Sequence, residues 1–369
     1  MNGIWVAPGR VNIIGEHTDY NGGYALPIAL PQVVTCAARA DSDGLVRVSS
    51  RQHPDEQVCE PISGLAEAEV TGWARYPLGV VHEYVRRGHR IPGVVLELDG
   101  AVPVGAGLSS SAAVECSVAV ALRDLFALPV TEADLIDIGR AAENDYVGAA
   151  TGTLDQSASV LCTAGHALFL DFDTGERAQV PFDLAAAGLE LLVIDTDTPH
   201  QLADGGYARR RRECEQAAAA LGVRSLREIS DVGDTERIGD PVVRRRARHI
   251  VTENARVLDV VEKLREGRDP RSIGPILTAG HASLRDDFEI STPQLDTAVA
   301  AALAAGAHGA RMVGGGFGGS IIALTDAERT GDIAGAVEKR FHEAGFTPPR
   351  TFVAVPSAGA HRISWTADK

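Results

Sequence analysis

The sequence predicts an α+β protein with two domains. Strand-like and helix-like segments are interleaved along the chain, without the regular alternation that marks a parallel βαβ protein. The chain has 369 residues, which is too long for one typical hydrophobic core and suits two fused domains. We place the boundary near Gly165–Leu189 and expect domains at 1–186 and 187–369.

The first half contains short strands and amphipathic helices. Apolar residues recur at helical spacing from Trp73 onward. Two serines precede the helix expected from Ser111, and either Ser109 or Ser110 suits its N-cap. The elements expected here are strands at Val46–Ser49 and Val94–Leu98 and helices at Trp73–Arg87, Ser111–Phe126 and Glu132–Val147.

The second half follows a predicted hairpin. Two strand-like segments, Ala167–Phe172 and Gln179–Phe182, flank the turn sequence Asp173-Thr174-Gly175. An apolar strand and three long helices come next, and two strands surround a cluster of glycines. These elements are expected at Leu189–Asp195, Gly206–Leu221, Val242–Glu266, Thr292–Ala305, Ala310–Val313 and Ile321–Thr325.

The composition excludes several kinds of partner. Apolar residues make up 45% and charged residues 23% of the chain, which is typical of a soluble globular protein. The net charge of −15 disfavours nucleic acid and anionic membranes. Arg209–Arg212 is a local basic run, which we expect to form a solvated helix face paired with Glu213 and Glu215.

Cysteine usage and the N-terminus indicate a cytoplasmic protein. The five cysteines are scattered and lack a C-x-x-C pair, which argues against a disulfide framework or a zinc site. Met1–Arg10 lacks the basic region and apolar stretch of a signal peptide. The Ala-rich run Ala112–Leu122 is too short to span a bilayer.

The segment Pro103–Ser111, here called the first glycine loop, is typical of a phosphate site. Its glycines allow the backbone to approach a ligand closely, and a helix with free N–H groups begins directly after it. The same residues would also suit a plain connection before a buried helix. The loop is not a Walker A motif, and the chain has only three lysines. Mg²⁺, arginine and helix N–H groups would then stabilise charge on a transferred phosphate.

A second glycine loop, Gly314–Gly319, formally contains G-x-G-x-x-G. The dinucleotide-binding interpretation fails because the loop leads into the strand Ile321–Thr325 and not into a helix. We expect this turn to pack against another loop, to let backbone approach a ligand, or to close a tight hairpin.

The segment Arg10–Gly23 concentrates polar side chains just after a short strand. Arginine, glutamate, histidine and aspartate all occur within ten residues. A surface loop can look like this, but carboxylates and imidazole also satisfy sugar hydroxyls directionally. Asp155, which follows Gly152 in Thr151–Gln156, would on its own be a turn former or a helix cap.

Together these segments resemble the galactokinases of the GHMP kinase superfamily, those of actinobacteria in particular. The N-terminal stretch resembles the signature G-R-x-N-[LI]-I-G-E-H-x-D-Y, and Pro103–Ala113 resembles the superfamily's phosphate loop. Further similar segments are Tyr207–Cys214, Ser283–Phe288 and Ala310–Gly319. The resemblance implies a two-domain GHMP kinase fold with the active site in the cleft between the domains. It also implies transfer of the γ-phosphate of ATP to the C1 hydroxyl of galactose, with Mg²⁺, by a monomer.

The resemblance also implies roles for matching residues. Arg10 and Asp155 would be the catalytic pair at the C1 hydroxyl. The sugar hydroxyls would be bound by Glu16, His17, Asp19, Gly152 and Tyr207. The phosphates would lie on the backbone of Gly105, Ala106, Gly107, Leu108, Ser109 and Ser110, with Ser111 and Glu143 holding Mg²⁺ and the β- and γ-phosphates. Trp73 would lie near the adenine, although a core aromatic on a helix suits it as well.

Several alternatives stay open from the sequence. Asp155 could be a general base, or it could orient the hydroxyl while Arg10 stabilises the transferring charge. An adjacent arginine would keep Asp155 ionised and make it a weak base, which favours orientation. The rival functions are a kinase for another sugar such as N-acetylgalactosamine or arabinose, a non-catalytic sugar sensor, and a mevalonate-type kinase. The intact first glycine loop argues against the sensor, and the Glu16–Tyr20 segment argues against the mevalonate-type kinase.

Overall fold

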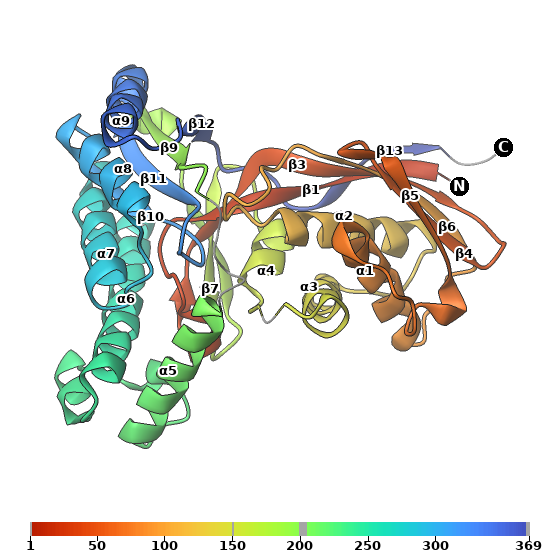
Figure 1. Ribbon diagram of the computed structural model, residues 1–369, viewed down its shortest axis with the longest axis horizontal. Coiled ribbons are helices and arrows are strands. Elements are labelled where there is room, and N and C mark those ends of the chain that lie inside the picture. Colours follow the sequence, from red (N-terminus) through yellow and green to blue (C-terminus); the bar gives the residue numbers. More distant parts are fainter. Residues whose placement is uncertain (1, 150, 199–204, 367–369) are drawn as a thin grey trace.

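The computed structural model describes residues 2–149, 151–198 and 205–366. Two halves lie along the long axis of the molecule, and strands β1 (Asn2–Asn12) and β13 (His361–Thr366) both reach the far end of the first half (Figure 1). Within the described residues, no helix combines the length and apolar character needed to cross a membrane.

The first half is a six-stranded sheet with helices against one face (Figure 1). The strand order is β13-β1-β3-β6-β4-β5, and only the β4–β6 pair is parallel. The strands are β1 (Asn2–Asn12), β3 (Pro27–Ala40), β4 (Leu45–Ser50), β5 (His53–Pro61), β6 (Val94–Gly100) and β13 (His361–Thr366). The helices are α1 (Arg75–Arg86), α2 (Ser110–Leu125), α3 (Glu132–Ala141) and α4 (Leu154–Leu161).

Sequence pattern explains how this half packs. In β3, Val34, Cys36 and Ala38 are buried while the residues between them are more exposed, as expected for a strand with one face on a core. Helix α2 is apolar on nearly every side, and it lies in the interior against β1 and β3.

The second half is built around a four-stranded sheet with the order β10-β11-β9-β12. Its strands are β9 (Leu189–Asp195), β10 (Gly309–Met312), β11 (Ser320–Asp326) and β12 (Arg350–Ala354). Its helices are α5 (Gly206–Leu221), α6 (Pro241–Arg265), α7 (Gly274–Asp286), α8 (Pro293–Ala304) and α9 (Thr330–Ala344). A small third sheet joins β2 (Tyr24–Ala25), β7 (His166–Asp171) and β8 (Arg177–Pro181).

One hydrophobic cluster joins the two halves. It contains Val11 and Ile28 of the first sheet, Leu108 of the first glycine loop, Val193 of β9 and Val257 of α6. The first glycine loop therefore lies where the two halves meet, and its position depends on packing from both of them.

Most of the predicted elements are confirmed, and the hairpin of β7 and β8 is antiparallel as expected. The helix expected at Glu132–Val147 is α3 followed by a π-helical turn over Ala142–Val147. The sequence did not predict β3, α4, α7 or α9. Helix α4 has only eight residues, and α7 begins with Gly274 and contains Gly280, which weakens its helical signal.

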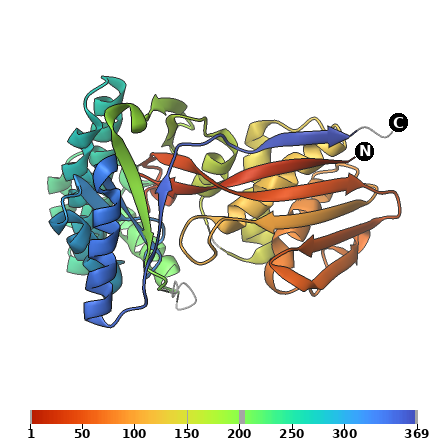
Figure 2. The same ribbon diagram turned by 90° about the horizontal axis from the view of Figure 1, so that it is seen from above.

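The domain division at 186 and 187 stays a prediction, but it does not account for β13. This last strand pairs with β1 and so adds the end of the chain to the sheet of the first half (Figure 2). Trp365 of β13 lies edge-on to the buried Trp5 of β1, with ring centroids 5.8 Å apart. No local sequence pattern indicates that the last strand pairs with the first.

Candidate active site

The first glycine loop has the backbone geometry of an anion cradle. Gly105, Gly107 and Ser109 have φ angles of 78°, 74° and 58°, whereas Ala106 and Leu108 are not in the left-handed region. This alternation turns successive N–H groups toward one side, as in other anion-binding nests. Helix α2 begins at Ser110, and its free N–H groups extend the cradle.

Ser109 does not cap α2 in the way the sequence suggested. It occupies the N-cap position, but in the left-handed conformation and without a side-chain bond to the helix. Its Oγ donates instead to Oδ2 of Asp155 at 2.5 Å. The expectation that Ser109 or Ser110 would cap the helix by its side chain is therefore wrong, because Asp155 accepts the hydroxyl of Ser109.

The two glycine loops lie against each other. A methyl group at Gly314 would lie 3.1 Å from the carbonyl oxygen of Gly107. Ser320, the first residue of β11, donates to the carbonyl oxygen of Ala106 at 2.8 Å. The expectation that the second glycine loop packs against another loop is confirmed.

Arg10 connects the first strand to both the first glycine loop and α4. Its Nε donates to Oδ1 of Asp155 at 2.7 Å, its Nη2 forms an ion pair with the same oxygen at 2.7 Å, and its Nη1 donates to the carbonyl oxygen of Gly107 at 2.6 Å. Arg10 and Ser109 together bind both oxygens of the Asp155 carboxylate, which is one-quarter exposed. The structure therefore brings the predicted catalytic pair together beside the glycine loop.

Glu143 is held next to Ser111 at the start of α2. Its Oε1 accepts from Ser111 Oγ at 2.9 Å, and its Oε2 accepts from Thr151 Oγ1 at 2.9 Å and Gln156 Nε2 at 2.8 Å. Glu143 belongs to the π-helical turn, a distortion often found at functional sites. Burial, together with the charge of Asp155, raises the pKa of Glu143.

The oxygens of Ser111 and Glu143 fit Mg²⁺. Mg²⁺ prefers hard oxygen ligands and commonly takes one or two protein ligands together with water and substrate phosphates. Within the described residues, no group of three or more His, Cys, Asp or Glu side chains forms a closed metal cage. The pair is thus suited to an ion that is shared with a bound nucleotide.

Asp19 and Gly152, two residues of the predicted sugar pocket, lie in contact with each other. A methyl group at Gly152 would overlap with Oδ2 of Asp19, so a larger residue would displace this carboxylate. Burial and the nearby charge of Asp155 raise the pKa of Asp19 to about 6. Two carboxylates therefore lie near each other and can accept bonds from hydroxyl groups.

His17 is held as a neutral ring between aromatic side chains. It lies against Tyr207, Tyr20 and Phe288, with ring centroids 5.0, 5.7 and 4.8 Å away. Its Nε2 lies 3.2 Å from the carbonyl oxygen of Gly315, which can only accept, so Nε2 carries the proton. Its Nδ1 then accepts from Tyr20 Oη at 2.7 Å. Burial lowers the pKa of His17 to about 4.

Glu16 differs from the simple picture of a carboxylate open to a sugar. It is 2% exposed, and it forms an ion pair with the fully buried Arg311, which also pairs with Glu253 at 2.7 Å. Burial raises the pKa of Glu16 to about 7, whereas Arg311 and Arg256 keep the pKa of Glu253 below its usual range. A role of Glu16 toward the sugar stays a prediction.

Comparison with known proteins identifies the family. The galactose-binding signature of galactokinases matches residues 1–40, and the N-terminal and C-terminal domains of GHMP kinases match residues 75–163 and 260–343. The galactokinase of Streptomyces coelicolor is 49% identical over 365 residues, which cover 98% of this chain and 94% of that one. The chain belongs to the galactokinase family. The GHMP kinase fold predicted from the sequence is confirmed.

Solved galactokinases and other GHMP kinases share this architecture. The crystal structure of Lactococcus lactis galactokinase complexed with galactose superposes with a TM-score of 0.93 at 33% identity, covering 98% of this chain and 95% of that one. Mevalonate kinase of Methanococcus jannaschii gives a TM-score of 0.67 at 15% identity, covering 96% of this chain and 98% of that one. The second match is one of fold alone.

Trp73, predicted to lie near the adenine, contacts the β4–β5 hairpin. Its ring stacks on His53 at 5.5 Å, and its Nε1 donates to Glu56 at 2.8 Å. Both partners belong to the β4–β5 hairpin, so these contacts hold Trp73 toward the hairpin. Its place beside an adenine stays a prediction.

The two lysines that the structure describes lie on helices α6 and α9, outside the first glycine loop. Lys263 pairs with Asp259 on α6 at 2.8 Å, and Lys339 is exposed on α9. Lys369 lies outside the described residues.

Sequence reasoning missed the side chains that support the site from behind. Gln156 follows Asp155 directly, and its Nε2 also donates to Glu115 at 3.0 Å, so it joins two buried carboxylates. Burial raises the pKa of Glu115 well above its usual value. The only sequence signal for Glu115 was a charged residue inside the otherwise apolar α2.

The arginine run on α5 is not a uniformly solvated face. Arg209 and Arg211 pair with Glu213 and Glu215 as predicted. Arg210, however, is buried, and it pairs with Glu213 while donating to backbone carbonyls of the segment after α7. The prediction is wrong for Arg210, because another helix and a loop cover its side of α5.

The buried His249 gives a prediction for stability. Burial lowers its pKa from 6.5 to about 3, so between these pH values the unfolded chain binds a proton that the folded protein does not. The free energy of unfolding should therefore fall as pH falls, and His249→Gln should make the fall shallower by up to about 1.4 kcal/mol per pH unit between pH 6 and 4.

Urea unfolding of both proteins at several pH values measures this slope. His53→Gln, which changes an exposed ring on the β4–β5 hairpin, is the control. Equal slopes for the wild-type protein and His249→Gln would contradict the assignment of His249 as a neutral buried group.

Proposed function

We propose that this protein transfers the γ-phosphate of ATP to the C1 hydroxyl of D-galactose, the first phosphorylation in galactose catabolism. The observation that carries the proposal is the position of Arg10, which joins Asp155 to the carbonyl oxygen of Gly107 in the first glycine loop. A hydroxyl placed at Asp155 would lie beside the cradle that suits phosphate. The chain also belongs to the galactokinase family, and the similar Lactococcus lactis enzyme was solved with galactose.

The glycine loop and α2 would hold the phosphates of ATP. The left-handed φ angles of Gly105, Gly107 and Ser109 suit a backbone N–H cradle for phosphate, and the positive end of the α2 dipole would add to its field. Arg10 would place a fixed positive charge near the transferring group. Such preorganised charges stabilise the transition state, because no solvent has to reorganise during the reaction.

Ser111 and Glu143 would hold Mg²⁺ together with the β- and γ-phosphates. The ion, when bound, would neutralise charge that develops on the phosphate oxygens. Thr151 and Gln156 keep the Glu143 carboxylate turned toward Ser111 by donating to its Oε2.

Asp155 would orient the C1 hydroxyl and not act as a strong base. Its carboxylate already accepts from Arg10 and Ser109, and these bonds fix the position of both of its oxygens. A loose transition state for phosphoryl transfer needs little early deprotonation of the nucleophile. The proton would pass to Asp155 only when the new P–O bond is well advanced.

Asp19, His17, Glu16, Gly152 and Tyr207 would form the sugar pocket. A pocket built from fixed polar groups rejects a sugar that lacks a matching hydroxyl, because the pocket's own groups would lose their partners. His17 and Tyr207 add an aromatic wall against the apolar face of the ring. Trp73 would lie on the adenine side of the nucleotide.

We place the protein in the cytoplasm as a monomer with the domains 1–186 and 187–369. All five cysteines are free, and four of them are buried, which suits a reducing compartment.

Release of ADP with ATP, Mg²⁺ and a panel of sugars tests the proposed function. The panel is galactose, glucose, galactosamine, N-acetylgalactosamine and arabinose. We expect turnover confined to galactose and its close C2 analogues. Tight binding of galactose without turnover would make the protein a sensor, and turnover of another sugar alone would contradict the assignment of the pocket.

Asp155→Asn tests the role of the carboxylate. We expect kcat to fall by about 100-fold or more, with a smaller change in KM for galactose, because the variant loses the charge that orients the hydroxyl and accepts its proton. Steady-state kinetics measures this effect, and Asp173→Asn in the exposed turn between β7 and β8 is the control variant. Near-normal turnover of Asp155→Asn would rule out both proposed roles. The pH dependence of kcat in Asp155→Glu then distinguishes between the two roles of this carboxylate, general base and orienting group.

Ser111→Ala tests the proposed metal ligands. Loss of one oxygen ligand should raise the Mg²⁺ concentration for half-maximal rate by about tenfold, and added Mg²⁺ should restore much of the rate. Titration of Mg²⁺ at fixed ATP and galactose measures this shift, with Ser42→Ala on the exposed β3–β4 turn as the control. An unchanged Mg²⁺ dependence would remove Ser111 from the metal site.

A further inference from the structure

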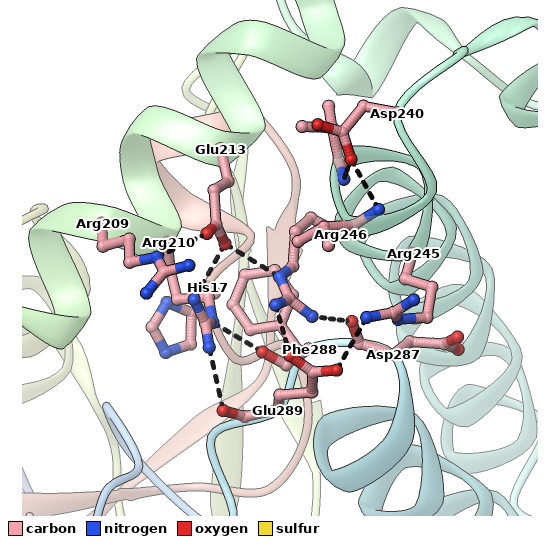
Figure 3. Close-up of polar contacts among 12 residues, drawn as sticks. His17, Arg209, Arg210, Glu213, Asp240, Arg245, Arg246, Asp287, Phe288 and Glu289 are labelled. Atoms are coloured by element: carbon pink, nitrogen blue, oxygen red, sulfur yellow. Dashed lines mark hydrogen bonds and ion pairs between the residues drawn. The ribbon is translucent and has the colours of Figure 1, made fainter.

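A network of charged side chains lies beside His17, a residue of the predicted sugar pocket (Figure 3). We call Arg210 and Glu213 of α5 and Arg246 of α6 the arginine clamp. Oε2 of Glu213 accepts from Arg210 Nη1 and from Arg246 Nε, each at 2.8 Å, so one carboxylate joins both guanidinium groups. The clamp thereby links two helices that are far apart in sequence.

The clamp holds the segment Asp287–Ile290, which follows α7. Arg246 Nη1 donates to the carbonyl oxygen of Asp287 at 2.5 Å. Arg210 donates to the next two carbonyl oxygens, from Nε to Phe288 at 2.6 Å and from Nη2 to Glu289 at 3.1 Å. Three consecutive carbonyl groups beyond a helix C-terminus are thus bound by two cations, which also suits the dipole of that helix.

The charged groups of the clamp are all paired, and its members are nearly inaccessible. Arg246 is 1% exposed, and Arg210 and Glu213 are each 7% exposed. Glu289 pairs with Arg246 by accepting from it at 2.6 Å. Removing one member of such a set leaves another charge buried without a partner, which costs far more than losing a surface pair.

The held segment has a backbone conformation that requires support. Glu289 has a φ of 54°, a left-handed conformation that a residue with a side chain seldom adopts. The clamp binds this residue at two points, because Arg210 takes its carbonyl oxygen and Arg246 its carboxylate.

The same segment forms the wall behind His17. The ring of Phe288 lies between His17 and His249, with centroids 4.8 and 4.5 Å away. Ile290 accepts from the backbone N–H of Phe317 in the second glycine loop at 2.7 Å. Tyr207, whose ring also contacts His17, lies one helical turn before Arg210 on α5. The clamp therefore connects two of the aromatic residues that contact His17.

We propose that the arginine clamp is a positioning device for the sugar pocket. It fixes Phe288 and Tyr207 against His17 and so controls the affinity for the sugar, while the first glycine loop and its phosphate chemistry stay unaffected. Arg210, Glu213 and Arg246 act through these aromatic residues and do not themselves contact the substrate. This inference rests on the proposed function, since it assigns His17 to the sugar.

Arg210→Lys tests the clamp, with Arg212→Lys as a matched control. Lysine keeps the charge but loses the planar fork that binds Glu213 and two carbonyl groups at once. Arg212 lies on the same helix and is exposed. We expect Arg210→Lys to raise KM for galactose by about tenfold while kcat and KM for ATP change less than about twofold. Arg212→Lys should leave all three values unchanged.

Hydrogen exchange gives a second measurement that does not depend on the sugar. In Arg210→Lys, amide protection should fall in 287–290 and also in 15–20, but not in 105–111. If Arg210→Lys does not fold, Glu289→Gln, which changes an exposed side chain, should give the same pattern with a smaller rise in KM.

Two results would overturn the clamp. A lower Tm with unchanged KM for galactose would leave it a purely structural network. A fall in kcat and a rise in KM for ATP as large as the rise in KM for galactose would mean that the clamp acts on the whole site. If the wild-type protein does not phosphorylate galactose, the proposed function fails, and the exchange pattern alone decides whether the clamp is coupled to the His17 segment.

Discussion

The guanidinium group of Arg10 is the point on which the proposed site depends. It extends from the first strand, and its donors reach Asp155 at the start of α4 and Gly107 in the first glycine loop. Three segments that lie far apart along the chain thereby meet at one side chain, since Gly107 is 97 positions and Asp155 is 145 positions from Arg10. The carboxylate and the phosphate cradle can only be used together if this meeting point is fixed, because a misplacement of about 1 Å can cost a factor of about a hundred in rate.

Buried charges keep the surrounding walls rigid. Glu16, Arg311, Glu253 and Arg256 form one set of paired charges beneath the N-terminal segment. The arginine clamp, together with Glu289, forms another beside His17. Each set is costly to bury and gives little net stability, but each strongly penalises any rearrangement that separates its partners. Such buried charges add little to the free energy of unfolding, but they hold the side chains around the site in one geometry. Recognition of a small polar sugar requires this fixed geometry.

Much of the fold and part of the site could be predicted from local sequence patterns. Helical spacing and turn residues located most of the long elements, and the glycine–serine run before an apolar helix indicated the phosphate cradle. Arg10 and Asp155 were paired only through the resemblance to galactokinases, since 145 positions separate them. The structure then placed them within one ion pair.

The rest depended on contacts that a linear pattern does not carry. Ser109 looked like a helix cap, because the acceptor of its hydroxyl, Asp155, comes from a distant element. Arg210 looked solvated because nothing in its own helix reveals that the segment after α7 covers it. Likewise β13 joined the first sheet although it lies at the other end of the chain. In each case a long-range partner overrode a reasonable local preference.

The central claim is that the sugar hydroxyl beside Asp155 is the one on C1, and nuclear magnetic resonance of the product tests it most directly. The protein is incubated with ATP, Mg²⁺ and galactose labelled with ¹³C at C1, and the labelled carbon is examined for coupling to phosphorus. The account predicts that the C1 signal of the product is split by ³¹P. A phosphorylated product whose C1 signal shows no such splitting would mean that another hydroxyl is attacked, and it would contradict the account.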